Sequence, residues 1–459
     1  MPGYGSWKEL YETEYLQMSE EGYPVMGTAE TPRAIQERLS GRGCEDGENN
    51  EAYWKSEYEK LWLIRGSGIR PDFPFSEPES LEEILAQASP VPELSPLSPA
   101  EYRDRVKGAW FGRCAGVVLG KPLEMCWDRH QVKSYLESAG SYPLQSWVPE
   151  RSEKTNQGTR SDCRPSTLGN ISYVQLDDDI HYTVSALLMA EEKGLDFTTL
   201  DVGMNMLENI PYHWFWTADR QAYYHLVNLA ADKPLTEQVA AIPLKLNPWR
   251  ECMVGFLRAD FWGYITPSDP RRGAEYIYRV ASLNLIKNGI YAGLFVQGCL
   301  SAALSQNPTV EKILGGGMSL IPYNSRLAYA VRDVCGWYET YKDFTAVSDL
   351  IYEKYGHWYF AGAINNIAFV TLALLHGGLD YGRTITTAVM CGSDTDCNSG
   401  TAGSIAAAAV GYNGLDDRWF IPLNDTVKTA VAGFGQGTIT ELAERTVRFY
   451  EEQKKGAYE

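Results

Sequence analysis

The chain has 459 residues, 44% of them hydrophobic and 12% aromatic, so it is long enough to enclose a large globular core. Its formal net charge of −18 argues against bulk binding to nucleic acid, because contact with phosphate backbones requires a basic surface. The nine cysteines are odd in number and form no C-x-x-C pair, which disfavours both a disulfide framework and a zinc ribbon.

The sequence shows neither a secretory signal nor an apolar run of membrane-spanning length. We therefore expect a cytoplasmic protein with reduced thiols, without a membrane or nucleic-acid partner. The sequence alone predicts no oligomeric state.

Three parts of the chain differ in composition. Residues 1–70 carry aromatic side chains at irregular helical spacing and are expected to form an N-terminal helical extension. Residues 71–99 are rich in proline, which predicts an extended, semi-rigid connector interrupted by a short helix over 81–88. Residues 100–459 are then expected to form the main domain.

The main domain opens with a glycine-marked helix. Ser98 and Glu101 are spaced as a capping box, and glycines follow at positions 108, 112, 116 and 120. Each glycine costs about 1 kcal/mol relative to alanine inside a helix, so the pattern predicts close packing against another helix. Pro122 is expected to end this helix and leaves Glu124 just beyond it.

Helical periodicity dominates the rest of the chain, and convincing alternating strands are scarce. We expect an all-α fold, a compact multi-helix bundle that carries the N-terminal extension. The clearest helical segments are 180–194, 199–209, 218–231, 275–305, 325–340, 346–355 and 361–376.

Three consecutive carboxylates, Asp177, Asp178 and Asp179, precede an apolar helical segment. Adjacent like charges repel one another unless water or a cation neutralises them. Two interpretations are open: a solvated helix start that is favoured by the helix dipole, or a metal site.

A second acidic pair, Asp394 and Asp396, runs into a segment of small residues that includes Gly400 and Gly403. A bare face of this kind predicts a buried helix that another backbone approaches closely. Clustered carboxylates at the N-terminal end of this helix suit a hard cation, whereas an ordinary helix cap is the simpler alternative. An EF-hand is excluded, since Gly400 lies one place late and Ile405 replaces the required glutamate.

Taken together, these motifs resemble those of the ADP-ribosylglycohydrolase family. Residues 116–124 are similar to the family's G-D-A-L-G-x-x-x-E segment, 177–179 to its T-D-D motif, and 392–403 to its G-x-D-T-D-T signature. The resemblance spans about residues 101–440. It implies an all-α bundle with a dinuclear Mg²⁺ centre that hydrolyses ribosyl glycosidic bonds.

The resemblance also implies roles for individual residues. Glu124 and Asp178 are expected to be catalytic, with Glu124 near the anomeric carbon. Residues expected to contact the substrate or support its site are Gly120, Thr395, Asn398 and His357. The expected metal ligands are Asp177, Asp178, Asp179, Asp394 and Asp396. Two registers are possible for the first motif, with either Asp177 or Leu176 in the place of the family's threonine; we favour Asp177, because leucine cannot bind a metal.

The sequence departs from the family pattern at two informative positions. Val117 stands where the family has aspartate, and Cys397 replaces the last threonine ligand. Thiolate sulfur is a poor ligand for Mg²⁺, so one of the two metal sites is expected to be weakened. The expected substrate is an ADP-ribosylated molecule or a related ribosyl conjugate. The alternatives are a small-molecule nucleoside or ribosyl hydrolase, and an inactive relative that binds ADP-ribose.

Overall fold

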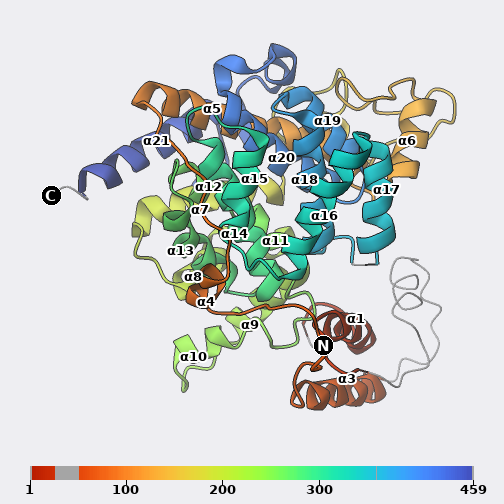
Figure 1. The fold of residues 1–459 in the computed structure, drawn as a ribbon, viewed down its shortest axis with the longest axis vertical. Coiled ribbons are helices and arrows are strands. Elements are labelled where there is room, and N and C mark those ends of the chain that lie inside the picture. The colour runs from red at the N-terminus through yellow and green to blue at the C-terminus, as the bar shows by residue number, and fades with distance from the viewer. Residues whose placement is uncertain (1–2, 26–50, 358, 457–459) are drawn as a thin grey trace.

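The computed structural model describes residues 3–25, 51–357 and 359–456, and within these residues the fold is all-α, as the sequence predicts. Two helices, α5 (Pro99–Gly120) and α20 (Thr395–Val410), lie in the upper part of the molecule as drawn in Figure 1. The described part of the chain also contains a two-stranded antiparallel sheet, β1 (Val427–Lys428) and β2 (Gln436–Gly437).

Helix α5 begins as predicted. The Ser98 hydroxyl accepts the backbone N–H of Glu101 at 3.3 Å, and the Glu101 carboxylate accepts the N–H of Ser98 at 2.8 Å. Pro99 occupies the first helical position, where its missing N–H costs no hydrogen bond. The helix ends at Gly120 and continues as the short 3₁₀ helix η1 (Lys121–Leu123), after which Glu124 follows.

The backbones of α5 and α20 touch directly. A Cβ atom on Gly112 would lie 2.4 Å from the Cβ of Ala407, and one on Gly120 would lie 2.2 Å from the carbonyl oxygen of Thr395. The predicted close packing of the two glycine-faced helices is therefore confirmed. The helices run antiparallel, so the C-terminal end of α5 meets the N-terminal end of α20.

Other helices enclose this pair. Helix α20 also contacts α14 (Lys287–Ala303), α18 (Ala363–Gly377) and α19 (Tyr381–Met390), while α5 contacts α21 (Ile439–Gly456). The indole N–H of Trp110 on α5 donates to the Thr446 hydroxyl on α21 at 3.0 Å. The meeting point of α5 and α20 is thus held by well-packed elements on several sides.

The remaining elements complete the bundle. The α-helices are α4 (Leu81–Ala86), α6 (Arg129–Ser138), α7 (Asp178–Lys193), α8 (Thr199–Asn209), α9 (Thr217–Val227), α10 (Leu235–Ala240), α11 (Val254–Leu257), α12 (Asp260–Tyr264), α15 (Val310–Met318), α16 (Arg326–Tyr341) and α17 (Phe344–Tyr355). The further 3₁₀ helices are η2 (Arg164–Ser166), η3 (Tyr212–Trp214), η4 (Tyr412–Gly414), η5 (Asp417–Trp419) and η6 (Ile421–Leu423). None of the described helices has the length and hydropathy needed to cross a membrane. The cysteines that the structure describes are all free thiols.

The single helix predicted over 275–305 is wrong, because the structure has two helices there, α13 (Pro270–Ala281) and α14. The N–H of Ile286 donates to the carbonyl of Arg250 at 3.0 Å instead of continuing α13, and Lys287 has a φ of +42°. Leu283 and Leu285, between the helices, are still buried in the core. The hydrophobic pattern therefore continues across the segment between α13 and α14, and for this reason it does not predict that the helix is interrupted there.

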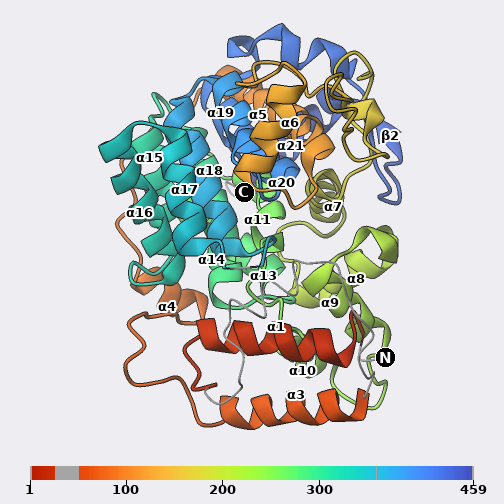
Figure 2. The same cartoon turned by 90° about the vertical axis from the view of Figure 1, so that its right-hand side faces the viewer.

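Two N-terminal helices, α1 (Trp7–Glu20) and α3 (Glu51–Arg65), lie side by side against one end of the bundle (Figure 2). Their contact with the bundle is ionic as well as apolar. The fully buried Arg250 guanidinium donates to Glu14 at 2.8 Å and to Glu21 at 2.6 Å. Since α1 and the residue after it supply the acids, and the bundle supplies the base, the two parts neutralise each other.

Candidate functional site

The first acidic cluster caps α7. Asp177 is the N-cap residue, and its Oδ1 accepts the backbone N–H of Asp179 at 3.0 Å. Asp178 and Asp179 lie in the first turn, where the helix dipole favours negative charge. Asp177 thus occupies a cap position, which threonine also commonly fills, and the register of the motif stays a prediction.

The second cluster opens α20. Asp394 is the N-cap residue, and Asp396, in the first turn, accepts the N–H of Cys397 at 3.0 Å. The turn before it places Gly392 and Ser393 at positive φ, +74° and +63°. The N–H of Ser393 donates to the carbonyl of Trp127 at 2.8 Å, which ties this turn to the segment that follows Glu124.

These elements bring the acidic side chains together. One carboxylate oxygen each from Glu124, Asp394 and Asp396 lie within 4.8 Å of one another. A second group, Asp179 with Asp396 and the Cys397 sulfur, meets the same limit. Residues far apart in sequence thus form one continuous acidic site at the meeting point of α5, α7 and α20.

Three basic side chains enter this site. The Lys121 ammonium forms an ion pair with Asp177 Oδ2, and Arg160 forms one with Glu124 Oε2. Arg113, fully buried on α5, donates to the Asp179 carboxylate and to the Asp179 carbonyl, at 2.8 and 2.9 Å. The cluster is therefore partly neutralised by the protein itself.

Burial and mutual repulsion shift the proton affinities of the acids. Burial raises the pKa of Asp178 to about 8, with the charges of Asp177 and Asp396 adding to the rise and Lys121 opposing it. Burial and the neighbouring charges of Asp396 and Asp394 likewise raise the pKa of Glu124 well above its usual range, against the effect of Arg160. Carboxylates in such surroundings gain from a nearby cation.

The Asp177 carboxyl differs from its neighbours. Although burial opposes ionisation, the Lys121 ammonium and the hydrogen bond from the N–H of Asp179 hold the pKa of Asp177 below its usual value. This carboxylate is therefore charged and already compensated.

The acidic residues of the site differ in their exposure to solvent. Asp177, Asp179, Asp394 and Asp396 are buried, each at most 5% exposed, whereas Asp178 and Glu124 are partly exposed. A ligand entering from solvent would therefore meet Asp178 and Glu124 first. These are the two residues for which the sequence predicts catalytic roles.

The donor set fits one hard divalent cation well. Asp394 Oδ1 is buried and finds no hydrogen-bond partner among the described residues, which is costly unless a cation binds it. Carboxylate oxygens from Glu124 and Asp396 lie close enough to share the same ion. The residues at this first position therefore suit Mg²⁺.

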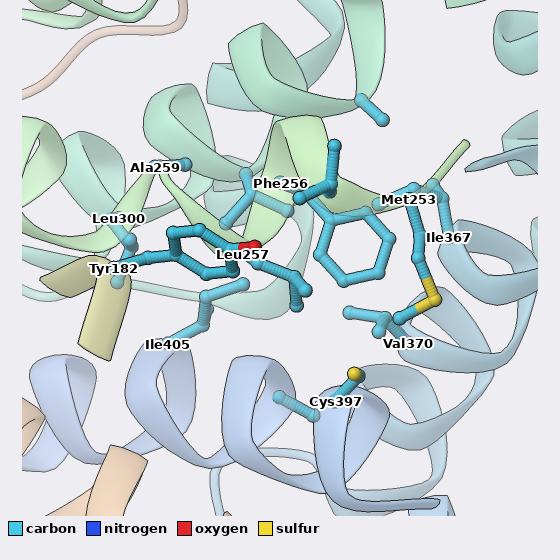
Figure 3. Packing of buried hydrophobic residues seen from close by; sticks show 14 of the residues in the cluster. Tyr182, Met253, Phe256, Leu257, Ala259, Leu300, Ile367, Val370, Cys397 and Ile405 are labelled. Carbon is cyan, nitrogen blue, oxygen red and sulfur yellow. The ribbon is translucent and has the colours of Figure 1, made fainter. Parts of the chain in front are cut away.

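The second group of donors fits less well. The Cys397 thiol donates to Asp179 Oδ2 at 3.0 Å, while Arg113 holds the other oxygen of the same carboxylate. Burial, and then the Asp179 charge, raise the pKa of Cys397 well above its usual value, so the sulfur stays protonated. Figure 3 shows Cys397 within the apolar cluster that contains Leu257 and Val370.

The other predicted site residues mostly support the turn. The Thr395 hydroxyl donates to the carbonyl of Gly120 at 2.8 Å, and both residues are buried between α5 and α20. Asn398 Nδ2 donates to Asn366 Oδ1 at 2.9 Å, beneath the acidic turn. His357 forms an ion pair with Glu20 of α1 at 2.8 Å, which places it at the contact with the N-terminal helices.

Sequence reasoning missed the basic residues of the site, Arg113, Lys121 and Arg160. A usable signal was present for two of them. Arg113 and Lys121 lie on or directly after a helix whose glycines predict burial, and a buried cation needs an acidic partner. No comparable signal marks Arg160, since it lies in the loop after α6.

The chain resembles known proteins mainly over the bundle that holds this site. The model of the family described as ADP-ribosylglycohydrolase matches residues 98–457. A solved structure described as an ADP-ribosylglycohydrolase-related protein complex shares 16% sequence identity with a TM-score of 0.47, covering 77% of this chain and 99% of that one. No curated protein matches the chain.

Proposed function

Because the chain belongs to the ADP-ribosylglycohydrolase family, we propose that it is a Mg²⁺-dependent hydrolase of a ribosyl glycosidic bond. One observation carries the proposal: Asp394 Oδ1 is buried without a partner among the described residues, and a carboxylate oxygen of Asp394 lies within 4.8 Å of oxygens of Glu124 and Asp396. An oxygen in that position gains most from a hard cation.

Asp394 and Asp396 are the main residues that would hold the ion, and Asp178 lies close enough for its charge to act on both. When bound, the ion supplies positive charge that grips ribose oxygens and polarises water. The protein fixes these carboxylates on the first turns of two packed helices, so they need not move when a ligand binds.

Glu124 and Asp178 handle the reacting atoms in this proposal. Cleavage of a glycosidic bond passes through a positively charged, oxocarbenium-like ribose and requires proton transfer to or from water or the leaving group. Both side chains are partly exposed, so both can reach a ligand that enters from solvent. Glu124 exchanges the proton, and Asp178, whose ionised form a bound cation favours, stabilises the ribose cation.

Arg160 acts as a positioning residue for Glu124. Its guanidinium binds Glu124 Oε2 and is itself held by Asp162 at 2.9 Å. A carboxylate held by one oxygen keeps its orientation while the other oxygen takes part in proton transfer.

The proposed substrate class is an ADP-ribosyl conjugate or a related ribosyl conjugate, either attached to a macromolecule or free as a small molecule. A second candidate function, binding of ADP-ribose without cleavage, is favoured by Arg113 and the Cys397 thiol, which occupy both oxygens of Asp179. Loss of a ligand carboxylate is one way in which a hydrolase becomes a binding protein.

The decisive experiment is a screen of ribosylated substrates with Mg²⁺ and with EDTA, read out as released ribose or ADP-ribose. We expect release only with Mg²⁺, and none from the Asp396→Asn variant. If the protein binds ADP-ribose but releases it from no conjugate, the proposed hydrolase is wrong and the second candidate, an ADP-ribose-binding protein, is supported. Release at equal rates in EDTA would contradict the role of the metal.

A further inference from the structure

Lys121 occupies a central position in the acidic site. Its side chain is only 7% exposed, and its ammonium group pairs with Asp177 from the first cluster. The same charge also acts on Asp396 from the second cluster and on Glu124. A single protein cation therefore links the two clusters, which is what a second metal ion would otherwise do.

The first cluster has few oxygens left for a second ion. Asp177 Oδ2 binds Lys121, and Asp177 Oδ1 accepts the N–H of Asp179 at 3.0 Å. Asp179 Oδ1 binds Arg113, and Asp179 Oδ2 accepts the Cys397 thiol at 3.0 Å. Of the three consecutive carboxylates, only Asp178 remains for a divalent cation.

We propose that the Lys121 ammonium takes the place of the second divalent cation, so that the site binds one metal ion per chain. The inference rests on the proposed function, because it assumes that the first ion binds at Asp394 and Asp396. It differs from the two-ion centre implied by the family resemblance. The fixed charge neutralises Asp177 without any dependence on the metal concentration.

Lys121 is a better candidate for this role than Arg113. Arg113 faces Asp179 and, at 3.7 Å, Asp260, so its charge is shared with a carboxylate outside the two clusters. Lys121 instead lies directly after α5, between Gly120, which packs on Thr395 of α20, and Glu124. Its position is therefore fixed by the same backbone contact that places the second cluster.

The test counts the metal ions that the full chain binds. The metal-free protein is titrated with Mn²⁺ as the probe, and bound ions are counted by equilibrium dialysis with elemental analysis. Electron paramagnetic resonance then distinguishes an isolated Mn²⁺ ion from a coupled pair. We expect one ion per chain and an uncoupled spectrum; two ions per chain, or none, would overturn the proposal.

Variants assign the effect to Lys121. Lys121→Met keeps the length of the side chain but removes its charge, so Asp177 becomes available and a second Mn²⁺ ion should bind, with a coupled spectrum. Lys121→Arg keeps the charge and should bind one ion. If Lys121→Met folds, as circular dichroism would show, but still binds one ion with unchanged affinity, Lys121 does not stand in for a metal.

Cys397→Thr serves as the matched variant. It places a hard oxygen ligand at the second position but leaves Lys121 on Asp177, so it should still bind one ion. A second ion in Cys397→Thr alone would show that the thiol, not the lysine, determines the count, and would refute the proposal even if Lys121→Met fails to fold.

The same titration separates this inference from the proposed function. One bound ion per chain without any hydrolysis would leave the inference standing and remove the hydrolase. Mg²⁺-dependent hydrolysis with two bound ions would support the hydrolase and refute the inference about Lys121.

Discussion

The Ser399 hydroxyl donates to the carbonyl of Gly116 at 2.7 Å, and a Cβ on Gly116 would lie only 2.2 Å from the Ser399 carbonyl oxygen. This contact joins α5 to α20 one turn after the acidic start of α20. Because the contact is made by backbone atoms and one small hydroxyl group, the two helices have no room to shift relative to each other at this point. It therefore sets the distance between Glu124, which follows α5, and Asp394 and Asp396, which open α20.

Substitution of Gly116 should disturb this contact. We expect Gly116→Ala to destabilise the protein by about 1–3 kcal/mol, since the new methyl group overlaps the α20 backbone. Gly336→Ala on α16 is the matched control, because nothing lies within 4 Å of the position its Cβ would take; it should stabilise by about 0.4–1 kcal/mol. Urea unfolding measures both, and equal stabilities would contradict the packing argument.

The charge of Asp396 should be needed for metal binding. Asp396→Asn keeps the shape of the side chain but removes a carboxylate that both ligand groups share. We expect Mg²⁺ affinity to fall at least tenfold, or about 1.4 kcal/mol, in a calorimetric titration. The exposed residue Asp72 provides a control, as Asp72→Asn should bind Mg²⁺ like the parent. An unchanged affinity in Asp396→Asn would place the ion elsewhere.

Glu124→Gln should act mainly on the rate. The amide keeps the size and an oxygen of the side chain but cannot exchange a proton, so turnover should fall by roughly 10²–10⁴-fold. Mg²⁺ affinity should fall less than in Asp396→Asn, because Asp394 and Asp396 remain. Single-turnover release of ribose or ADP-ribose, paired with a Mg²⁺ titration, gives both quantities. A loss below tenfold would demote Glu124 to a residue that only orients the substrate.

Acid should weaken the fold through His181. Its Nε2 accepts the N–H of Ala430 at 3.0 Å, and burial lowers the pKa of His181 from 6.5 to about 4, against the effect of Asp177. Below pH 6.5 the unfolded chain therefore binds the proton first, and stability falls as the pH falls toward 4. The loss from this group at pH 5 is about 2 kcal/mol.

Comparison with His181→Gln isolates the effect of this histidine. The glutamine can accept the same N–H but does not titrate in this range, so the variant should lose less stability than the parent between pH 7 and pH 5. Urea unfolding at both values measures the difference. Parallel losses in the two proteins would show that His181 does not contribute.

Arg250 should hold the N-terminal helices in place. Arg250→Met leaves the buried carboxylates Glu14 and Glu21 without their main partner, which costs about 3–5 kcal/mol for a buried pair. Lys55→Met, which removes an exposed pair with Glu59 at 3.8 Å, should change stability by less than about 1 kcal/mol. Limited proteolysis should cut Arg250→Met faster near α1 and α3, whereas equal cleavage of both variants would argue against the ionic contact.

The sequence predicts those features that depend on local pattern. The capping box at Ser98 and the four-residue spacing of the glycines in α5 depend on neighbours within one helix, and both are confirmed. Helix α8 also has the predicted bounds of 199–209. Convergence of the two acidic clusters followed from the resemblance, not from spacing, since Asp178 and Asp394 are 216 residues apart (394 − 178).

Features that depend on distant partners could not be predicted in the same way. The break between α13 and α14 arises because Ile286 bonds to Arg250, a contact that leaves the apolar pattern intact. The pairing of His357 with Glu20 joins residues 337 positions apart. The neutralisation of Asp177 and Asp179 by Lys121 and Arg113 depends on how α5 crosses α7, and no periodicity records that crossing.

The ionic contact beneath the bundle also determines how the polypeptide can be shortened. Removal of residues 1–97 would delete Glu14, Glu21 and Glu77, the acidic partners of Arg250, Lys287 and Arg326, which are all buried. A fragment restricted to the family-matched stretch would remove these acidic partners from three buried cations, would keep the ion pair of Arg326 with Glu251, and would expose the surface that α1 now covers. The smallest stable expression fragment therefore has to begin well upstream of the region that identifies the family.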